Sequence, residues 1–291
     1  MKSKKKPLGT KAQIRAQKER ERKISTAIFT ALILIVIMFS AYFGYSLLSQ
    51  PQSQTENPEP LSSQPKAAIV DQLSLTFPNQ TFIETATNTL KQAGYSVDYY
   101  PGEEVTVEFY RNLPTYGYKI IILRVHSSAT GAQGTESPVT LFTSERESQT
   151  KYVYEQLTDQ LMSVAYSKEE REKGITYFGI SPPFVTQNMK GKFPNTIIIM
   201  MGCEGLDNPL MAEALVEKGA KVYISWNQPV SASHTDTATT QLLQHFLIEK
   251  LTLKQSVQET FKEIGFDPIY KSLLIYYPLE AGEQTIKNIK R

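Results

Sequence analysis

The sequence contains a single cysteine, Cys203, which excludes a disulfide bond within the chain. It also lacks a glycine-rich loop of the kind that binds phosphates or dinucleotides, and it shows no internal repeat. Charge of either sign is missing from Ile24 to Thr55. The 291 residues are enough for one large domain or two small ones.

The uncharged run predicts a membrane span at residues 24–48, ISTAIFTALILIVIMFSAYFGYSLL. This segment supplies the approximately 20 apolar residues that cross the core of a bilayer. A secretory signal peptide is the alternative, but its apolar region is usually about 7–15 residues long and ends at a small-residue cleavage site. Because the run is longer and the following YSLLSQPQ is a poor cleavage site, we expect an uncleaved transmembrane helix.

Charge is distributed unevenly along the chain. Residues 1–23 carry ten Lys or Arg against two Glu, whereas the remaining residues carry 21 Lys or Arg against 27 Asp or Glu. Lys and Arg stay on the cytoplasmic side of a membrane. We therefore expect a single-pass protein of the cell membrane, with a basic N-terminal tail in the cytoplasm and the body outside it. A nucleic-acid-binding body would itself be basic, so no nucleic-acid partner is expected.

Residues 49–66 are rich in Ser, Gln and Pro and predict a linker, and residues 67–291 predict a folded domain. In this domain apolar runs alternate with helical patterns, which indicates an α/β fold with a mostly parallel sheet between helices. The expected strands are 66–74, 95–100, 118–126, 195–202, 220–226 and 271–278. The expected helices are 81–94, 103–113, a helix capped by Asp207 and ended by Gly219, 237–251 and 255–265. Elsewhere we expect a short hairpin arm at 137–145, a helix within 151–162 and a loop at Pro182–Pro183.

Two of the apolar runs end in the same way. IILRVHSSATG stops on His126 and turns polar, and NTIIIMMGCEG stops just before Cys203. In a parallel sheet, functional groups collect beyond the carboxyl ends of the strands. Neighbouring strands lie about 4.8 Å apart, so the two side chains can reach one another or a shared substrate carbonyl.

A cysteine and a histidine so placed can form a nucleophile and its base. The thiolate is the attacking species, and an imidazole can accept the proton of the thiol. Gly202 and Gly205 leave space for a backbone to approach, and the N–H groups near Cys203 and after His126 can bind an oxyanion. The alternatives are that Cys203 is a small buried side chain and that His126 is a hydrogen-bonded loop residue.

These segments resemble the caspase-like (caspase–hemoglobinase, clan CD) cysteine peptidases. VHSSATG is similar to the family's histidine motif, and IIIMMGCEG is similar to its cysteine motif, with the Cys-x-Gly of the caspase form. The stretch GAKVYISWNQPVSASHTDTATTQLLQHFLIEKLTLKQSVQE is similar to the segment after the cysteine in the CHAT and gingipain branches. The resemblance covers about residues 67–278 and implies a three-layer caspase-like fold.

The resemblance implies Cys203 as the nucleophile and His126 as the base or proton donor. The oxyanion hole would lie at the turns of Ser127 and Gly202, with the backbone amides of Cys203 and of the residue after His126 as donors. Ser127 departs from the family, which usually has glycine at that position. Its side chain can crowd the substrate or restrict the turn.

The resemblance also implies a pocket for the substrate side chain. Trp226, which ends the strand after the cysteine strand, would lie beside that pocket, although a buried aromatic is an equally good interpretation. A pocket for basic side chains would need an acidic residue. Asp71, Glu204 and Asp236 are the candidates, and the sequence does not choose among them.

We therefore expect a membrane-anchored cysteine endopeptidase that cleaves peptide or protein substrates through a thioester intermediate. The resemblance implies no metal and no organic cofactor. The main alternative is a catalytically inactive caspase-like domain that binds peptides or partner proteins in the same cleft. A third hypothesis, a scaffold domain without cleft chemistry, predicts that Cys203 lies buried and far from His126.

Overall fold

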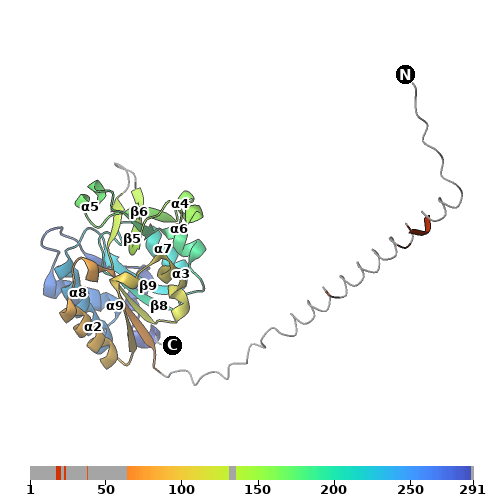
Figure 1. The fold of residues 1–291 in the computed structure, drawn as a ribbon. Coiled ribbons are helices and arrows are strands. Elements are labelled where there is room, and N and C mark those ends of the chain that lie inside the picture. Colours follow the sequence, from red (N-terminus) through yellow and green to blue (C-terminus); the bar gives the residue numbers. More distant parts are fainter. Residues whose placement is uncertain (1–17, 21–22, 24–37, 39–63, 131–135, 290–291) are drawn as a thin grey trace, which may run out of the picture. The chain divides into compact units, whose positions relative to one another are not determined.

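The computed structural model describes residues 18–20, 23, 38, 64–130 and 136–289 (Figure 1). The chain divides into two units, Met1–Ser62 and Ser63–Arg291, and every strand described below belongs to the second unit. The expected cytoplasmic tail, membrane span and linker lie almost entirely outside the described residues. None of the helices that the described residues form is long and apolar enough to cross a membrane.

The central sheet is mostly parallel, as the sequence predicts. Among the described residues it contains six strands in the order β10-β9-β8-β3-β1-β2, with only β10 antiparallel to its neighbour. The strands are β1 (Lys66–Asp71), β2 (Ser96–Pro101), β3 (Ile120–Arg124), β8 (Thr196–Met200), β9 (Ala220–Trp226) and β10 (Leu274–Tyr277). Strands β3 and β8 are buried along their whole length and lie side by side, which explains why all their residues except Arg124 and Thr196 are apolar.

Helices cover both faces of this sheet (Figure 1). One face packs against α2 (Gln80–Gln92), α8 (Ala232–Leu243) and α9 (Leu253–Ile264). The other packs against α3 (Val107–Asn112), α6 (Pro182–Asn188) and α7 (Leu210–Glu217). Successive strand residues contribute to opposite cores, as the period of two requires; Ile122 packs with the first set of helices and Leu123 with the second.

The remaining helical elements are short. They are η1 (Gln72–Leu75), η2 (Gly102–Glu104), η3 (Leu113–Tyr116), α4 (Val153–Leu157), α5 (Lys168–Glu172), η4 (Gln244–Ile248), η5 (Leu279–Glu283) and α10 (Ile286–Ile289). Element η4 is a π-helical turn that continues α8.

A second, antiparallel sheet was not predicted as such. In the described residues its order is β4-β5-β7-β6, formed by β4 (Ser127–Thr130), β5 (Glu136–Arg146), β7 (Tyr177–Ile180) and β6 (Leu161–Val164). The expected hairpin arm at 137–145 is the long strand β5. The Pro182–Pro183 pair begins α6 instead of lying in a loop, because proline fits the first turn of a helix, where no backbone donor is needed.

Two helix starts also differ from expectation. Helix α7 begins after Pro209, and Asn208 rather than Asp207 supplies a side-chain acceptor, to the N–H of Leu210 at 3.3 Å. Helix α8 begins at Ala232, several residues before the expected start, because the polar stretch that precedes the apolar stripe is itself helical.

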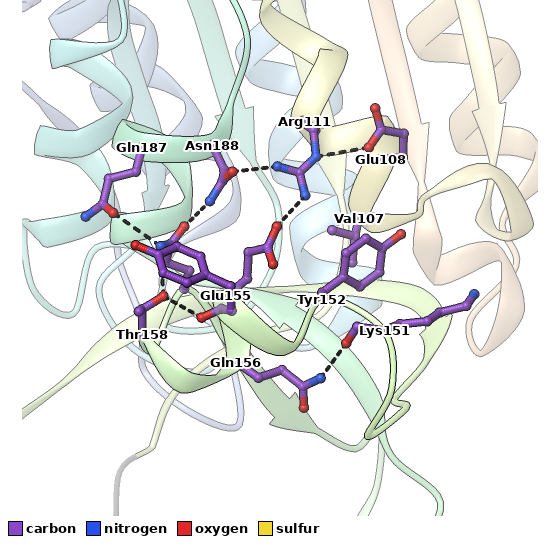
Figure 2. Close-up of polar contacts among 12 residues, drawn as sticks. Val107, Glu108, Arg111, Lys151, Tyr152, Glu155, Gln156, Thr158, Gln187 and Asn188 are labelled. Carbon is purple, nitrogen blue, oxygen red and sulfur yellow. Dashed lines mark hydrogen bonds and ion pairs between the residues drawn. The ribbon is translucent and has the colours of Figure 1, made fainter. Parts of the chain in front are cut away.

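A polar network connects the second sheet's segments to the helices of the central domain. Arg111 of α3 binds Glu155 of α4 at 3.0 Å, Asn188 of α6 at 2.6 Å and Glu108 at 2.9 Å (Figure 2). Its guanidinium also lies over the ring of Phe184. Since the side chains of Arg111 and Glu155 are largely buried, this network fixes α4, and with it the start of β6, against the core.

Candidate functional site

His126 and Cys203 line the same hollow on the protein. They follow the carboxyl ends of β3 and β8, which are neighbours in the sheet with Leu123 opposite Met200. The hollow has a volume of about 470 Å³. Its lining consists of His126, Ser127, Ser128, Thr140, Phe142, Met162, Ser163, Val164, Ala165, Tyr166, Ser167, Lys168, Arg171 and Cys203.

The imidazole of His126 is held by one hydrogen bond and by aromatic rings. Its Nε2 lies 2.9 Å from Oγ1 of Thr76, and its ring stacks on Tyr166 with centroids 5.3 Å apart. Its backbone N–H donates to Oε1 of Gln72 at 2.9 Å. Burial, and secondarily the nearby Arg124 guanidinium, lowers the pKa of His126 to about 4. The ring is therefore neutral at pH 7 and can accept a proton.

The thiol of Cys203 lies against the backbone of Val230. Its Sγ is 3.5 Å from both the carbonyl oxygen and the nitrogen of that residue. Burial raises the pKa of the Cys203 thiol, and the charges of Glu204 and Asp267 raise it further. Among the described residues no hydrogen bond joins Sγ to the ring of His126. The site thus contains a neutral thiol and a neutral imidazole, not a preformed ion pair.

Ser127 and Gly202 fasten the histidine and cysteine segments together. The hydroxyl of Ser127 donates to the carbonyl oxygen of Cys203 at 2.5 Å. A Cβ at Gly202 would lie 2.3 Å from the carbonyl oxygen of Val125 and 2.4 Å from Oγ of Ser127, so only glycine fits there. A glycine at position 127 would therefore leave the carbonyl oxygen of Cys203 without this hydrogen-bond donor.

Two backbone N–H groups near Cys203 and His126 form no hydrogen bond with the described residues. Phe142 donates to the carbonyl oxygen of His126, so Ser127 belongs to a non-hydrogen-bonded pair of the β4–β5 ladder and directs its N–H away from β5. The N–H of Ala129, which follows on the same side of β4, binds the carboxylate of Glu204 at 2.8 Å. Among the described residues the N–H of Cys203 makes no hydrogen bond. The N–H groups of Ser127 and Cys203 can therefore serve a ligand.

Asp71 and Asp236 bind Arg124, a residue that the sequence analysis did not single out. Nη1 of Arg124 lies 2.8 Å from Asp71, and its Nε and Nη2 lie 2.8 and 2.9 Å from the two carboxylate oxygens of Asp236. All three side chains are buried. A signal was available: an arginine in a strand that is apolar on both faces needs acidic partners, and Asp71 lies opposite Arg124 in the β1–β3 register.

The other two candidates for substrate binding are also engaged in the fold. Glu204 holds β4 through the N–H of Ala129 and has a left-handed backbone, with φ at 59°. Trp226 is 2% exposed, and its indole N–H donates to Thr235 at 2.9 Å. It packs against Val230 behind Cys203. Of the four candidates Asp71, Glu204, Asp236 and Trp226, none is among the described residues that line the hollow.

Most residues that line the hollow were not predicted from the sequence. They come from the second sheet, the segment after β6 and α5, and they include Phe142, Met162, Tyr166, Lys168 and Arg171. No spacing in the sequence marks them, because the strands that gather them are short and pair across long loops. Among the described residues no group of three or more His, Cys, Asp or Glu is arranged to hold a metal ion.

Similarity to known proteins is found at the level of structure. No family model matches the chain, and no curated protein matches it. Among solved structures, the crystal structure of the Arg-specific cysteine proteinase gingipain R is similar at 14% identity, with a TM-score of 0.41. The match covers 76% of this chain and 44% of that one, so this chain spans less than half the length of the proteinase. The function is therefore inferred from the residues of the hollow.

We expect Arg124→Met to lower the free energy of unfolding by about 3–5 kcal/mol, because it leaves two buried carboxylates without their cation. Chemical denaturation measures the loss. Lys173→Met, an exposed position at the end of α5, is the control and should change stability by no more than about 0.5 kcal/mol. A loss below about 1 kcal/mol for Arg124→Met would show that the network contributes little to stability.

We expect the alkylation rate of Cys203 by iodoacetamide to rise about tenfold per pH unit from pH 6 to beyond pH 8. Burial raises the thiol pKa above its usual value of 9.0, so the reactive thiolate fraction is small at pH 7 and grows with pH. Mass spectrometry of the chain, native and in urea, gives the two profiles. A native rate that is already constant between pH 6 and 8 would instead indicate a thiolate–imidazolium pair.

Proposed function

We propose that this protein is a cysteine endopeptidase of caspase-like type with Cys203 as nucleophile and His126 as general base. One observation carries the proposal. The only thiol of the chain and an imidazole reach the same hollow from the carboxyl ends of two adjacent parallel strands. That edge of a parallel sheet is where catalytic groups gather, and a peptide can enter a hollow of this volume.

The neutral pair suits a mechanism in which the proton moves as the thiol attacks. His126 takes the proton of the Cys203 thiol, the sulfur bonds to the peptide carbonyl carbon, and the carbonyl oxygen becomes an oxyanion. In the tautomer whose Nε2–H donates to Oγ1 of Thr76, Nδ1 is the unprotonated nitrogen that accepts this proton. The N–H groups of Ser127 and Cys203 are the donors available to the oxyanion.

Collapse of the tetrahedral intermediate completes acylation. The C–N bond breaks, the imidazolium of His126 gives its proton to the leaving amine, and a thioester remains on Cys203. Water then attacks the thioester carbonyl while His126 accepts one of its protons. The C–S bond breaks, the acid product leaves, and the sulfur recovers the proton, so no external oxidant or reductant is needed.

A catalytically inactive member that binds peptides is the second candidate. Three observations favour it. The sulfur is hydrogen-bonded to the backbone of Val230, and the imidazole is hydrogen-bonded to Thr76. Among the described residues, no hydrogen bond joins the sulfur to the imidazole. A neutral thiol must also lose its proton as the sulfur attacks, whereas a preformed thiolate has already lost it. Against it, Ser127 does not block the junction, because its hydroxyl is bound to a carbonyl oxygen on the cysteine loop.

The membrane anchor is part of the proposal. The run without charge from Ile24 to Thr55 and the basic segment before it support a single helix at residues 24–48 with the N-terminus in the cytoplasm. In this arrangement the enzyme acts on peptides or proteins outside the cytoplasm, without a nucleic-acid partner. The acidic balance of the residues beyond the tail agrees with that assignment.

We expect a peptidyl acyloxymethyl ketone to label the wild-type chain, and His126→Ala to slow this labelling by about 10²–10⁴-fold, the usual effect of losing a general base. Because Cys203 is the only cysteine, the failure of Cys203→Ala to react establishes only the position of the label. Iodoacetamide is therefore the reference reagent, and its rate should change little in His126→Ala. Ser233→Ala, an exposed position outside the hollow, is the matched control.

Hydrolysis separates the two candidate functions. A peptidase converts peptides of a mixed library into two fragments, and both Cys203→Ala and His126→Ala abolish the products. A silent member binds peptides of the library without forming products. Equal labelling of the wild type and His126→Ala by the peptidyl reagent, together with no fragment from the library, would refute the peptidase proposal.

A further inference from the structure

The hollow extends from Cys203 along the face of the second sheet that carries Thr140, Phe142 and Val164, side chains that are themselves largely buried. The opposite face of that sheet is packed into the core by residues such as Leu141, Leu161 and Phe178. On the face that lines the hollow, Thr140 and Val164 lie over Gly179 of β7. A Cβ at Gly179 would approach Cγ2 of Thr140 to 2.4 Å and Cγ1 of Val164 to 2.8 Å. The glycine thus lets both side chains lie low against the sheet, which deepens the hollow.

The charges that line the hollow are all positive at the end formed by α5. Lys168 and Arg171 belong to the lining, and no described carboxylate does. Both cations are exposed, and Arg171 forms no ion pair with any described residue. Lys168 has only a long contact with Glu172, at 3.8 Å. An unpaired guanidinium beside an open hollow is a donor for a carboxylate of the ligand.

The acidic residues of α5 do not neutralise this end. Glu169 pairs with Lys173, outside the lining. Glu170 keeps its charge, but its two carboxylate oxygens accept hydrogen bonds from the N–H of Tyr166 and the hydroxyl of Tyr177 and form no ion pair with Arg171. Near the cysteine, the three acids that a basic substrate would require are bound within the protein, to Arg124 or to a backbone amide.

We propose that the hollow selects peptides that carry an acidic side chain, whose carboxylate binds Arg171 and Lys168 while neighbouring residues lie along the face of the second sheet that lines the hollow. The inference deepens the proposed function and rests on it for the position of the scissile bond. His126 stacks on Tyr166, and Lys168 follows only two residues later, so the cationic end lies a few residues of extended peptide from Cys203. The acidic residue is thus bound at a distance from the bond that is cut.

Binding to the full chain carrying Cys203→Ala tests the selection without turnover. The probes are fluorescent peptides that differ at a single position, Glu, Gln or Lys. We expect the Glu peptides to bind about three to ten times more tightly than the Gln peptides at low salt, and the difference to shrink at about 0.5 M salt. The charge reversal Lys168→Glu with Arg171→Glu should remove this preference or turn it toward Lys.

Lys173→Glu is the matched control, since it makes a charge reversal at the end of the same helix outside the hollow and should leave the preference unchanged. Equal affinities for the Glu and Gln peptides, an equal effect of Lys173→Glu, or no binding by any peptide would overturn the inference. If the charge preference appears but the unmodified chain cleaves nothing, the selection stands and the peptidase proposal fails. If peptides are cleaved without a charge preference, the peptidase proposal stands and the selection fails.

Discussion

The burial of Arg124 is the constraint on which the functional edge of the sheet depends. A guanidinium at the end of a strand that is closed on both faces is tolerated only when carboxylates surround it. Asp71 reaches it from β1 and Asp236 from α8, and the carbonyl oxygen of Phe77 completes the set at 2.7 Å. The network joins two strands and a helix, and it fixes the point from which the chain continues to His126, two residues later.

Burial, and for His126 also the charge of Arg124, determines the electrostatic state of the site. The positive charge of Arg124 adds to burial in keeping the imidazole neutral. Burial also keeps the Cys203 thiol protonated. Proton transfer from the sulfur to the imidazole is therefore unfavourable in the free protein. In the proposed reaction the proton moves only when a substrate carbonyl is present to accept the sulfur, and this ordering protects the thiol from unwanted chemistry at rest.

The sequence predicted the central sheet well and the second sheet poorly, for physical reasons. Strands such as β3 and β8 consist almost entirely of apolar residues, and such a run indicates a strand that is buried on both faces. Strands β4, β6 and β7 have four residues each and pair across loops, so their sequences carry no distinct period. Pattern reasoning identified the positions of His126 and Cys203 at strand ends. The arginine in the apolar run calls for acidic partners, but that Asp71 is one of them follows only from the register of β1 and β3.

The fold and the specificity of the hollow are connected through these acids. A carboxylate can bind either a buried arginine of the fold or a basic side chain of a substrate, and Asp71 and Asp236 are used for the first purpose. Glu204 is used in the same way, since its carboxylate caps the backbone of β4. Among the described residues, the charged side chains that line the hollow are then Lys168 and Arg171 of α5, a short surface helix without buried residues. In the proposed function, substrate preference can therefore change at Lys168 and Arg171 while the network around Arg124 stays intact.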